Sequence, residues 1–131
     1  MLQGATFFLP KPEKEKDIHK LSKIIKKQQI SHTLTLPSLH TLILEEADSP
    51  QLKYLRLINV SGEVCSTSMA QKDEQLLPWA QLYNLYGPTE AAVNCTYFTI
   101  PKGFDTPKVP IGCSIFNHPN IQKSNYRNRL S

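Results

Sequence analysis

Short apolar runs alternate along the chain with segments whose apolar side chains recur at helical spacing. The run 5–9, ATFFL, is closed by Pro10 and predicts a short buried strand. The segment 17–29 predicts an amphipathic helix, with Asp17 at the positive end of the helix dipole. Its apolar face would be formed by Ile18, Leu21, Ile24 and Ile25, with lysines turned to water.

A second strand and helix come next. The alternating run 31–36, SHTLTL, predicts a strand that stops at Pro37. Pro37 suits the first turn of a helix that we expect to continue to about Glu46, with an inner stripe of Leu39, Leu42 and Ile43.

The middle of the chain repeats this alternation. The run 52–60, LKYLRLINV, predicts a strand, 67–77 a helix and 80–86, AQLYNLY, a further strand. A short helix at 89–94 and a strand at 96–100, TYFTI, are expected after them.

Strands that alternate with helices indicate βαβ units. We therefore expect an α/β fold, with a partial, mostly parallel sheet and flanking helices. Ligands of such sheets bind beyond the carboxyl ends of the strands. The glycine-bearing loops 60–63 and 86–90 both follow strands, which predicts that they share this edge.

Composition is consistent with a single globular domain. The chain has 131 residues, of which 40% are hydrophobic and 20% charged. We expect the domain to occupy residues 1–117, because the periodicity then ends and the Asn-rich, basic stretch 118–131 predicts an irregular, disordered tail.

Charge and cysteine patterns exclude several classes of partner. The net charge is +4, but acids interrupt the basic segment and no aromatics interleave with it, which argues against nucleic-acid binding. No apolar run approaches the roughly 18 residues that span a membrane, and no signal peptide is recognised. Cys65, Cys95 and Cys113 are too widely spaced for a metal site and predict reduced thiols in a cytoplasmic protein.

The stretch 84–95, NLYGPTEAAVNC, carries the candidate chemistry. In one interpretation it is a tight turn, with Thr89 as a helix cap and Glu90 as a first-turn acid. In the other it is a nucleotide site, in which Tyr86 is a flat platform and Thr89 and Glu90 contact phosphate and metal.

Around this stretch, residues 4–117 resemble the adenylation domains of nonribosomal peptide synthetases, members of the acyl-adenylate-forming superfamily. The run LYNLYGPTEAAVNCTYF is similar to their adenine-binding signature. The run LKYLRLINVSGEVCS resembles the preceding strand and its Gly-Gly-Glu loop, with Ser61 in place of the first glycine.

Two further segments resemble this family. The run ISHTLTLPSLHTLIL is similar to the strand–Pro–helix unit that walls the amino-acid pocket. The run VPIG resembles the start of a Pro-Ile-Gly-Arg-Pro segment, although Cys113 and Ser114 stand where Arg and Pro are usual. The two loops in this order favour the nucleotide interpretation of the stretch 84–95.

The resemblance implies a role for each matching residue. Tyr86 would stack on adenine, a contact worth about 1–3 kcal/mol. Thr89 would contact the α-phosphate, and Glu90 would hold Mg²⁺. The other implied nucleotide-binding residues are Ser61, Gly62, Asn84, Leu85 and Gly87. The implied substrate pocket is mostly apolar, and consists of Thr35, Ile58, Val60, Leu85, Val93 and Asn94.

The activity that the resemblance implies is the conversion of ATP and an amino acid to aminoacyl-AMP and pyrophosphate. The acceptor would be the phosphopantetheine of a neighbouring carrier domain. The family's phosphate loop and its lid lysine have no counterpart here, so we expect a slice of the large N-terminal subdomain, inactive alone. A non-catalytic remnant, a small nucleotide-binding or interaction module, and an acyl- or aryl-CoA ligase stay open as alternatives.

Overall fold

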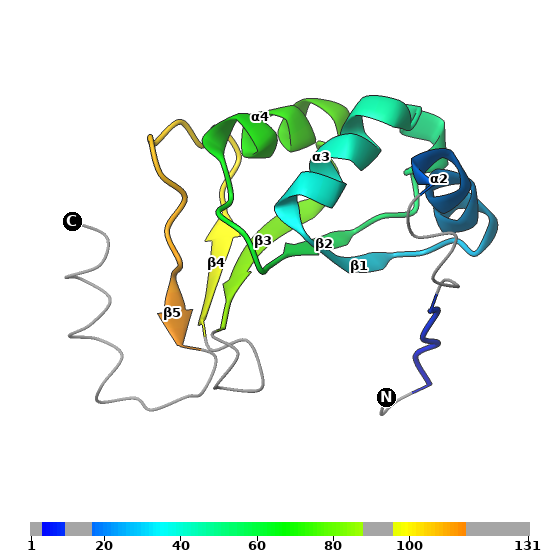
Figure 1. The fold of residues 1–131 in the computed structure, drawn as a ribbon, viewed down its shortest axis with the longest axis horizontal. Coiled ribbons are helices and arrows are strands. Elements are labelled where there is room, and N and C mark those ends of the chain that lie inside the picture. Colours follow the sequence, from blue (N-terminus) through cyan, green and yellow to red (C-terminus); the bar gives the residue numbers. More distant parts are fainter. Residues whose placement is uncertain (1–3, 10–16, 88–95, 115–131) are drawn as a thin grey trace.

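The computed structural model describes residues 4–9, 17–87 and 96–114, which contain one sheet with helices over one of its faces (Figure 1). The helices are α2 (Ile18–Lys27), α3 (Pro37–Glu46), the 3-10 turn η1 (Ser49–Gln51) and α4 (Thr67–Leu76). The strands are β1 (His32–Thr35), β2 (Leu57–Val60), β3 (Gln81–Tyr86), β4 (Thr96–Ile100) and β5 (Cys113–Ser114).

The strands lie in the sheet in their order along the chain. The pairs β1–β2 and β2–β3 are parallel, and α3 and α4 provide the crossovers that parallel neighbours need. The strand β4 is antiparallel to β3, and β5 is antiparallel to β4, so only β4 runs against the others. The predicted α/β fold with a mostly parallel sheet is confirmed.

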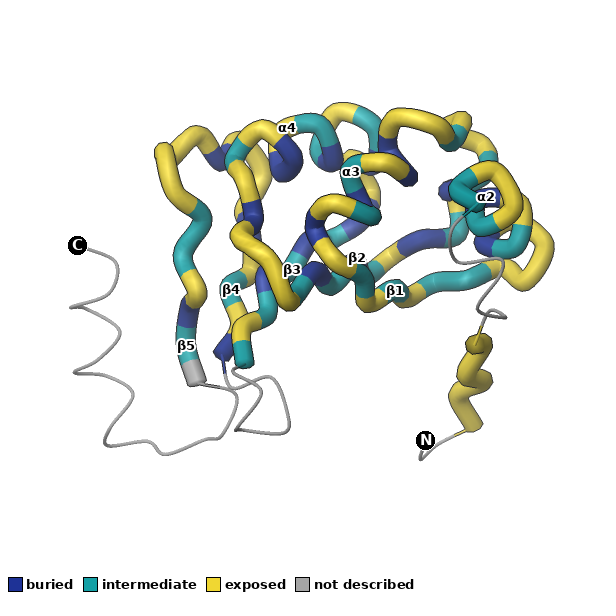
Figure 2. The backbone as a smooth tube through the Cα atoms, in the orientation of Figure 1, coloured by how far each residue is buried: buried dark blue, intermediate teal, exposed yellow. Residues whose placement is uncertain are grey.

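The hydrophobic core lies between the sheet and its helices (Figure 2). Alternation along β2 shows why: Ile58 and Val60 are fully buried, whereas Leu57 and Asn59 on the other face are only partly covered. We call these two sides the covered face and the open face. No described helix is long and apolar enough to cross a membrane.

Helix α2 forms where it was predicted. The Asp17 carboxylate accepts a hydrogen bond from the Lys20 backbone N–H at 3.2 Å and caps the helix. Ile25 enters the core, and the last turn carries Lys26 and Lys27, whose charges favour the helix dipole. A positive φ of 51° at Gln29 follows the end of the helix.

Helix α3 has the predicted bounds but is rotated relative to the predicted stripe. Leu42 is 45% exposed, while His40 and Leu44 are buried beside Ile43. The cause is a polar contact in the core: His40 Nε2 lies 2.7 Å from the Asp73 carboxylate on α4. A buried carboxylate needs such a partner, which turns His40 inward and Leu42 outward.

The predicted strand 52–60 is wrong in its first half. The strand β2 begins only at Leu57, and the preceding residues form a turn. Leu52 and Leu55 are each 1% exposed, so their apolar character reflects burial of the turn in the core rather than strand alternation. The backbone N–H groups of Arg56 and Leu57 both donate to the carbonyl of Ser31, the residue just before β1.

The predicted buried strand 5–9 is also wrong. This segment has no strand structure and is exposed, with Phe7 at 69% and Leu9 at 73%. A strand exists only through hydrogen bonds to a neighbour, and none of the described strands pairs with it. The predicted helix 89–94 and tail 118–131 lie outside the described residues.

The buried contact between His40 and Asp73 predicts a large effect on stability. The substitution His40→Ala leaves the Asp73 carboxylate buried without its partner, and we expect a loss of about 2–4 kcal/mol in the free energy of unfolding. The matched control is Leu42→Ala on the same helix, where an exposed side chain is shortened and we expect about 0.5 kcal/mol or less. Urea denaturation measures both, and equal losses would contradict the assignment.

Burial, together with the nearby Asp73 charge, raises the pKa of the Cys65 thiol to about 11. The folded state therefore holds this proton more tightly than the unfolded chain, where the pKa is 9.0. The resulting stability is complete below pH 9.0 and is lost as the pH rises toward about 11. Between pH 8 and roughly pH 10.5, we expect the free energy of unfolding of Cys65→Ala to fall by about 2 kcal/mol less than that of the unmodified chain. Urea denaturation of both proteins at the two pH values measures this difference, and identical pH profiles would exclude it.

Candidate functional site

The carboxyl ends of β1, β2 and β3 meet at one edge of the sheet, as predicted. Register places Thr35 beside Val60 and Val60 beside Asn84, and β3 continues to Tyr86, which pairs with Thr96 at the start of β4. We call this the carboxyl edge. It brings together the described nucleotide candidates, which are Ser61, Gly62, Asn84, Leu85, Tyr86 and Gly87.

The loop after β2 depends on one glycine. Gly62 has a φ of 90°, and a Cβ placed on it would lie 2.9 Å from the Leu36 side chain. Ser61 does not have a positive φ, and its backbone N–H donates to the Thr35 carbonyl at 3.0 Å. The position where the family has its first glycine therefore accepts a serine, whereas Gly62 cannot be replaced without strain.

Glu63 has a role that sequence reasoning missed. Its carboxylate accepts the Ser38 backbone N–H at 3.0 Å and the Ser38 hydroxyl at 2.9 Å. Helix α3 has Leu36 at its N-cap and so lacks a capping side chain of its own. The loop supplies the cap instead, which ties it to the start of α3. The sequence does contain one sign of this role: the residue immediately before Pro37 is apolar, so α3 needs a cap from another segment.

Asn84 fixes a neighbouring segment to the edge. It is 6% exposed, and its amide Nδ2 donates to the Pro110 carbonyl at 2.9 Å. Close packing continues at Gly112, which has a φ of 83° and where a Cβ would clash with the Tyr97 carbonyl. The VPIG segment is thus held against β3 and β4 by contacts that need an amide at 84 and a glycine at 112.

Tyr86 and Leu85 lie on opposite faces because side chains alternate along a strand. Tyr86 shares a face with Asn84 at the end of β3, and its side chain is 47% exposed. Leu85 is on the open face, opposite Tyr97 in the register of β4. The structure therefore leaves a tyrosine ring accessible at the edge and separates it from Leu85.

Within the described part of the chain, two threonine hydroxyls at the carboxyl edge are buried without a partner. The Oγ1 atoms of Thr35 and Thr96 have no hydrogen-bond partner among the described residues, and Thr33, two positions before Thr35, is in the same state. An unsatisfied buried hydroxyl costs about 1–3 kcal/mol.

Of the described pocket candidates, Thr35, Ile58 and Val60 lie on the covered face and Leu85 on the open face. Ile58 and Val60 belong to the core and are 0% exposed, while Thr35 and Leu85 keep some exposed surface on opposite faces. The remaining candidates, Thr89, Glu90, Val93 and Asn94, lie outside the described residues. Within those residues, no group of three or more His, Cys, Asp or Glu side chains is arranged to hold a metal ion.

Comparison with known proteins gives a consistent result. A family model described as AMP-binding enzyme matches residues 1–122. Gramicidin S synthase 2 of Brevibacillus brevis is 34% identical over 118 residues, covering 89% of this chain and 3% of that protein. Phosphinothricin tripeptide synthetase PhsB of Streptomyces viridochromogenes is 33% identical over 114 residues, covering 87% of this chain and 9% of that protein.

Solved structures share the fold. The crystal structure of CmiS6 has a TM-score of 0.71 and 22% identity, with 81% of this chain and 26% of that chain covered. The Vibrio cholerae adenylation domain AlmE, in complex with glycyl-adenosine-5'-phosphate, has a TM-score of 0.65 and 26% identity, with 77% and 20% covered. By its family match and its relatives, the chain belongs to the AMP-binding enzymes and corresponds to part of a nonribosomal peptide synthetase adenylation domain.

Proposed function

We propose that the chain is part of an amino-acid-adenylating ligase of nonribosomal peptide synthesis, and that its carboxyl edge contributes the adenine side of the nucleotide site. One observation carries this proposal. In a chain of the AMP-binding family, the edge presents a half-exposed ring at Tyr86, at the end of the strand that adjoins the loop of Gly62. An accessible aromatic ring is a platform on which adenine can stack.

In the proposed reaction an amino-acid carboxylate oxygen attacks the α-phosphorus of ATP, and pyrophosphate leaves. Tyr86 stacks on the adenine, Thr89 binds the α-phosphate, and Glu90 holds Mg²⁺, which offsets phosphate charge. Similar structures support the nucleotide: one synthetase is solved with AMPPNP and AlmE with glycyl-adenosine-5'-phosphate.

Asn84 acts in this proposal through its amide oxygen. The Pro110 carbonyl can only accept a hydrogen bond, so the Asn84 nitrogen faces it and is occupied. The oxygen of the same amide is the group that can accept from the exocyclic amine of adenine. Asn84 would then hold the 109–112 segment and the base at the same time.

The amino-acid pocket is proposed from sequence matches. Its wall would be formed by Thr35, Ile58, Val60, Leu85, Val93 and Asn94. Because Ile58 and Val60 are in the core and Leu85 is on the open face, the described residues do not form such a wall by themselves. A mostly apolar wall favours a hydrophobic or small polar amino acid.

The acceptor is proposed to be a carrier domain that bears phosphopantetheine. A protein of similar structure, PA1221, contains adenylation and PCP domains, which supports this partner. The chain spans only 3% and 9% of the two synthetases compared above, so we also propose that its 131 residues do not catalyse adenylation alone. Their sequence has no Ser/Thr/Gly-rich run ending in Lys-Gly to neutralise phosphate charge.

The 131-residue chain is predicted to bind AMP weakly. One stacking contact of about 1–3 kcal/mol competes with about 1–2 kcal/mol for each loop residue that becomes ordered. We expect a Kd weaker than about 1 mM, or less than roughly 4 kcal/mol of binding free energy. An NMR titration that follows the tyrosine ring resonances measures the Kd, and Tyr86→Ala is expected to abolish the response.

The matched control is Tyr97→Ala, which removes a comparably exposed ring from the opposite face of the same edge. This variant should keep the AMP response, and loss in both variants would contradict stacking on Tyr86. Pyrophosphate exchange with a panel of amino acids is expected to stay at the level of the blank. Micromolar AMP binding that depends on Tyr86, or exchange above the blank, would show that the chain works alone.

A further inference from the structure

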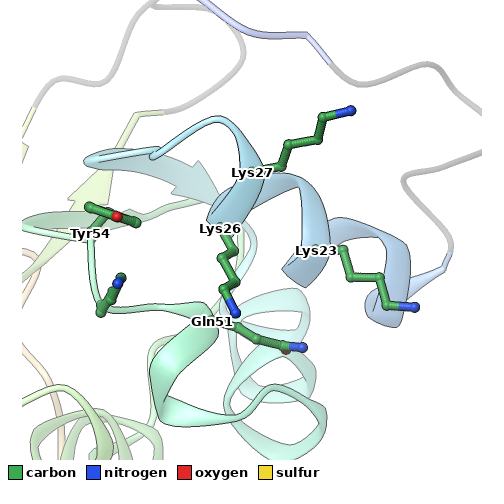
Figure 3. A pocket seen from close by; sticks show the side chains of 6 residues that line it. Lys23, Lys26, Lys27, Gln51 and Tyr54 are labelled. Atoms are coloured by element: carbon green, nitrogen blue, oxygen red, sulfur yellow. The ribbon is translucent and has the colours of Figure 1, made fainter.

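A basic hollow lies at the end of the sheet opposite the carboxyl edge. It is an open concavity of about 510 Å³ beside the amino ends of β1 and β2 (Figure 3). Helix α2 forms one side, and η1 with the turn that follows it forms the other. The hollow is lined by Lys23, Lys26, Lys27, Gln51, Lys53 and Tyr54.

Among the described residues, the lining contains four lysines and no carboxylate. Three acids of the adjoining helices are paired elsewhere: Asp17 with Lys20, Glu45 with Lys72 and Glu46 with His19. Asp48, just before η1, forms no ion pair with the lysines of the hollow. Within the part of the chain that the structure describes, the lysines of the hollow have no ion pair. The concavity therefore concentrates positive charge that no ion pair among the described residues balances.

The geometry of α2 does not account for this concentration. Lys26 and Lys27 favour the dipole at the end of the helix, but Lys23 stands one turn earlier and repels Lys27 across four residues. Lys53 comes from a different element, and its Nζ lies 4.9 Å from the centroid of the Tyr54 ring. Two segments that are separate in the sequence thus bring their lysines to one hollow.

The donors present fit phosphate groups. A lysine ammonium is a compact charge with three donors and binds phosphate oxygens as a point charge. The planar donor fork that suits carboxylates is missing, because Arg56 Nη1 donates to the Lys53 and Leu55 carbonyls at 2.7 and 3.0 Å. Figure 3 shows Lys26 directed toward Gln51, whose amide adds a neutral hydrogen-bonding group.

We propose that the basic hollow binds a compact anion with several phosphate groups, at a site separate from the carboxyl edge. Lys23 and Lys27 extend from α2 away from Gln51 and Tyr54 (Figure 3), and their flexible stems allow the ammonium groups to turn onto a bound anion. The ligand is either a free oligophosphate or the oligophosphate tail of a nucleotide. The proposal does not depend on the function proposed for the carboxyl edge.

The test is a calorimetric titration of the full 131-residue chain with inorganic triphosphate, and separately with ATP, at low salt. The variant Lys26→Gln/Lys53→Gln removes two charges from the hollow. The control Lys72→Gln/Lys108→Gln removes two charges elsewhere on the surface. Thermal melts followed by circular dichroism establish that both variants are folded before binding is compared.

We expect saturable triphosphate binding that weakens about tenfold or more in the hollow variant and less than about twofold in the control. Raising the salt concentration should weaken binding to the unmodified chain, because the contacts are ionic. Triphosphate binding without ATP binding identifies a free oligophosphate as the ligand, and similar affinities show that nucleotide tails also enter.

Four results would overturn the proposal. Absence of saturable binding would remove the site, and equal weakening in the two lysine variants would show a general effect of net charge. Triphosphate binding that is lost in Tyr86→Ala but kept in the hollow variant would place the anion at the carboxyl edge. A DNA oligonucleotide that binds more tightly than triphosphate through the same lysines would identify a nucleic-acid surface instead.

Discussion

Parallel pairing of β1, β2 and β3 is the constraint on which the rest of the molecule depends. Each pairing requires the chain to return from one end of the sheet to the other, and α3 and α4 make these returns over the same face. That arrangement creates the covered face with its core, and it gathers three strand ends at one edge. The fold and the candidate nucleotide site therefore have a single physical origin.

Hydrogen bonds between segments distant in the sequence hold the carboxyl edge together. The Glu63 carboxylate caps α3 through Ser38, and the Asn84 amide holds the Pro110 carbonyl. These groups satisfy backbone positions that the strands and helices leave open. These hydrogen bonds hold the loops in place, and the Tyr86 ring beside them remains exposed.

The sequence was most informative where local chemistry decides the structure. Asp17 and Pro37 marked the two helix starts correctly, and the glycine loops lay at the same edge. Prediction from the sequence failed where tertiary contacts determine the structure. The contact of His40 with Asp73 rotates α3, and residues 5–9 lack a neighbouring strand among those described. The roles of Glu63 and Asn84 were likewise hidden, because their partners are far away in the sequence.

The open face has a consequence for the handling of this chain in solution. β1 is an outer strand of the described sheet, and Leu34 on it is 63% exposed. Outer strands with apolar side chains readily pair with other chains, and such pairing grows with protein concentration. Purified material is therefore expected to aggregate more readily than a protein whose sheet is covered on both sides, and dilute samples will preserve the monomer best.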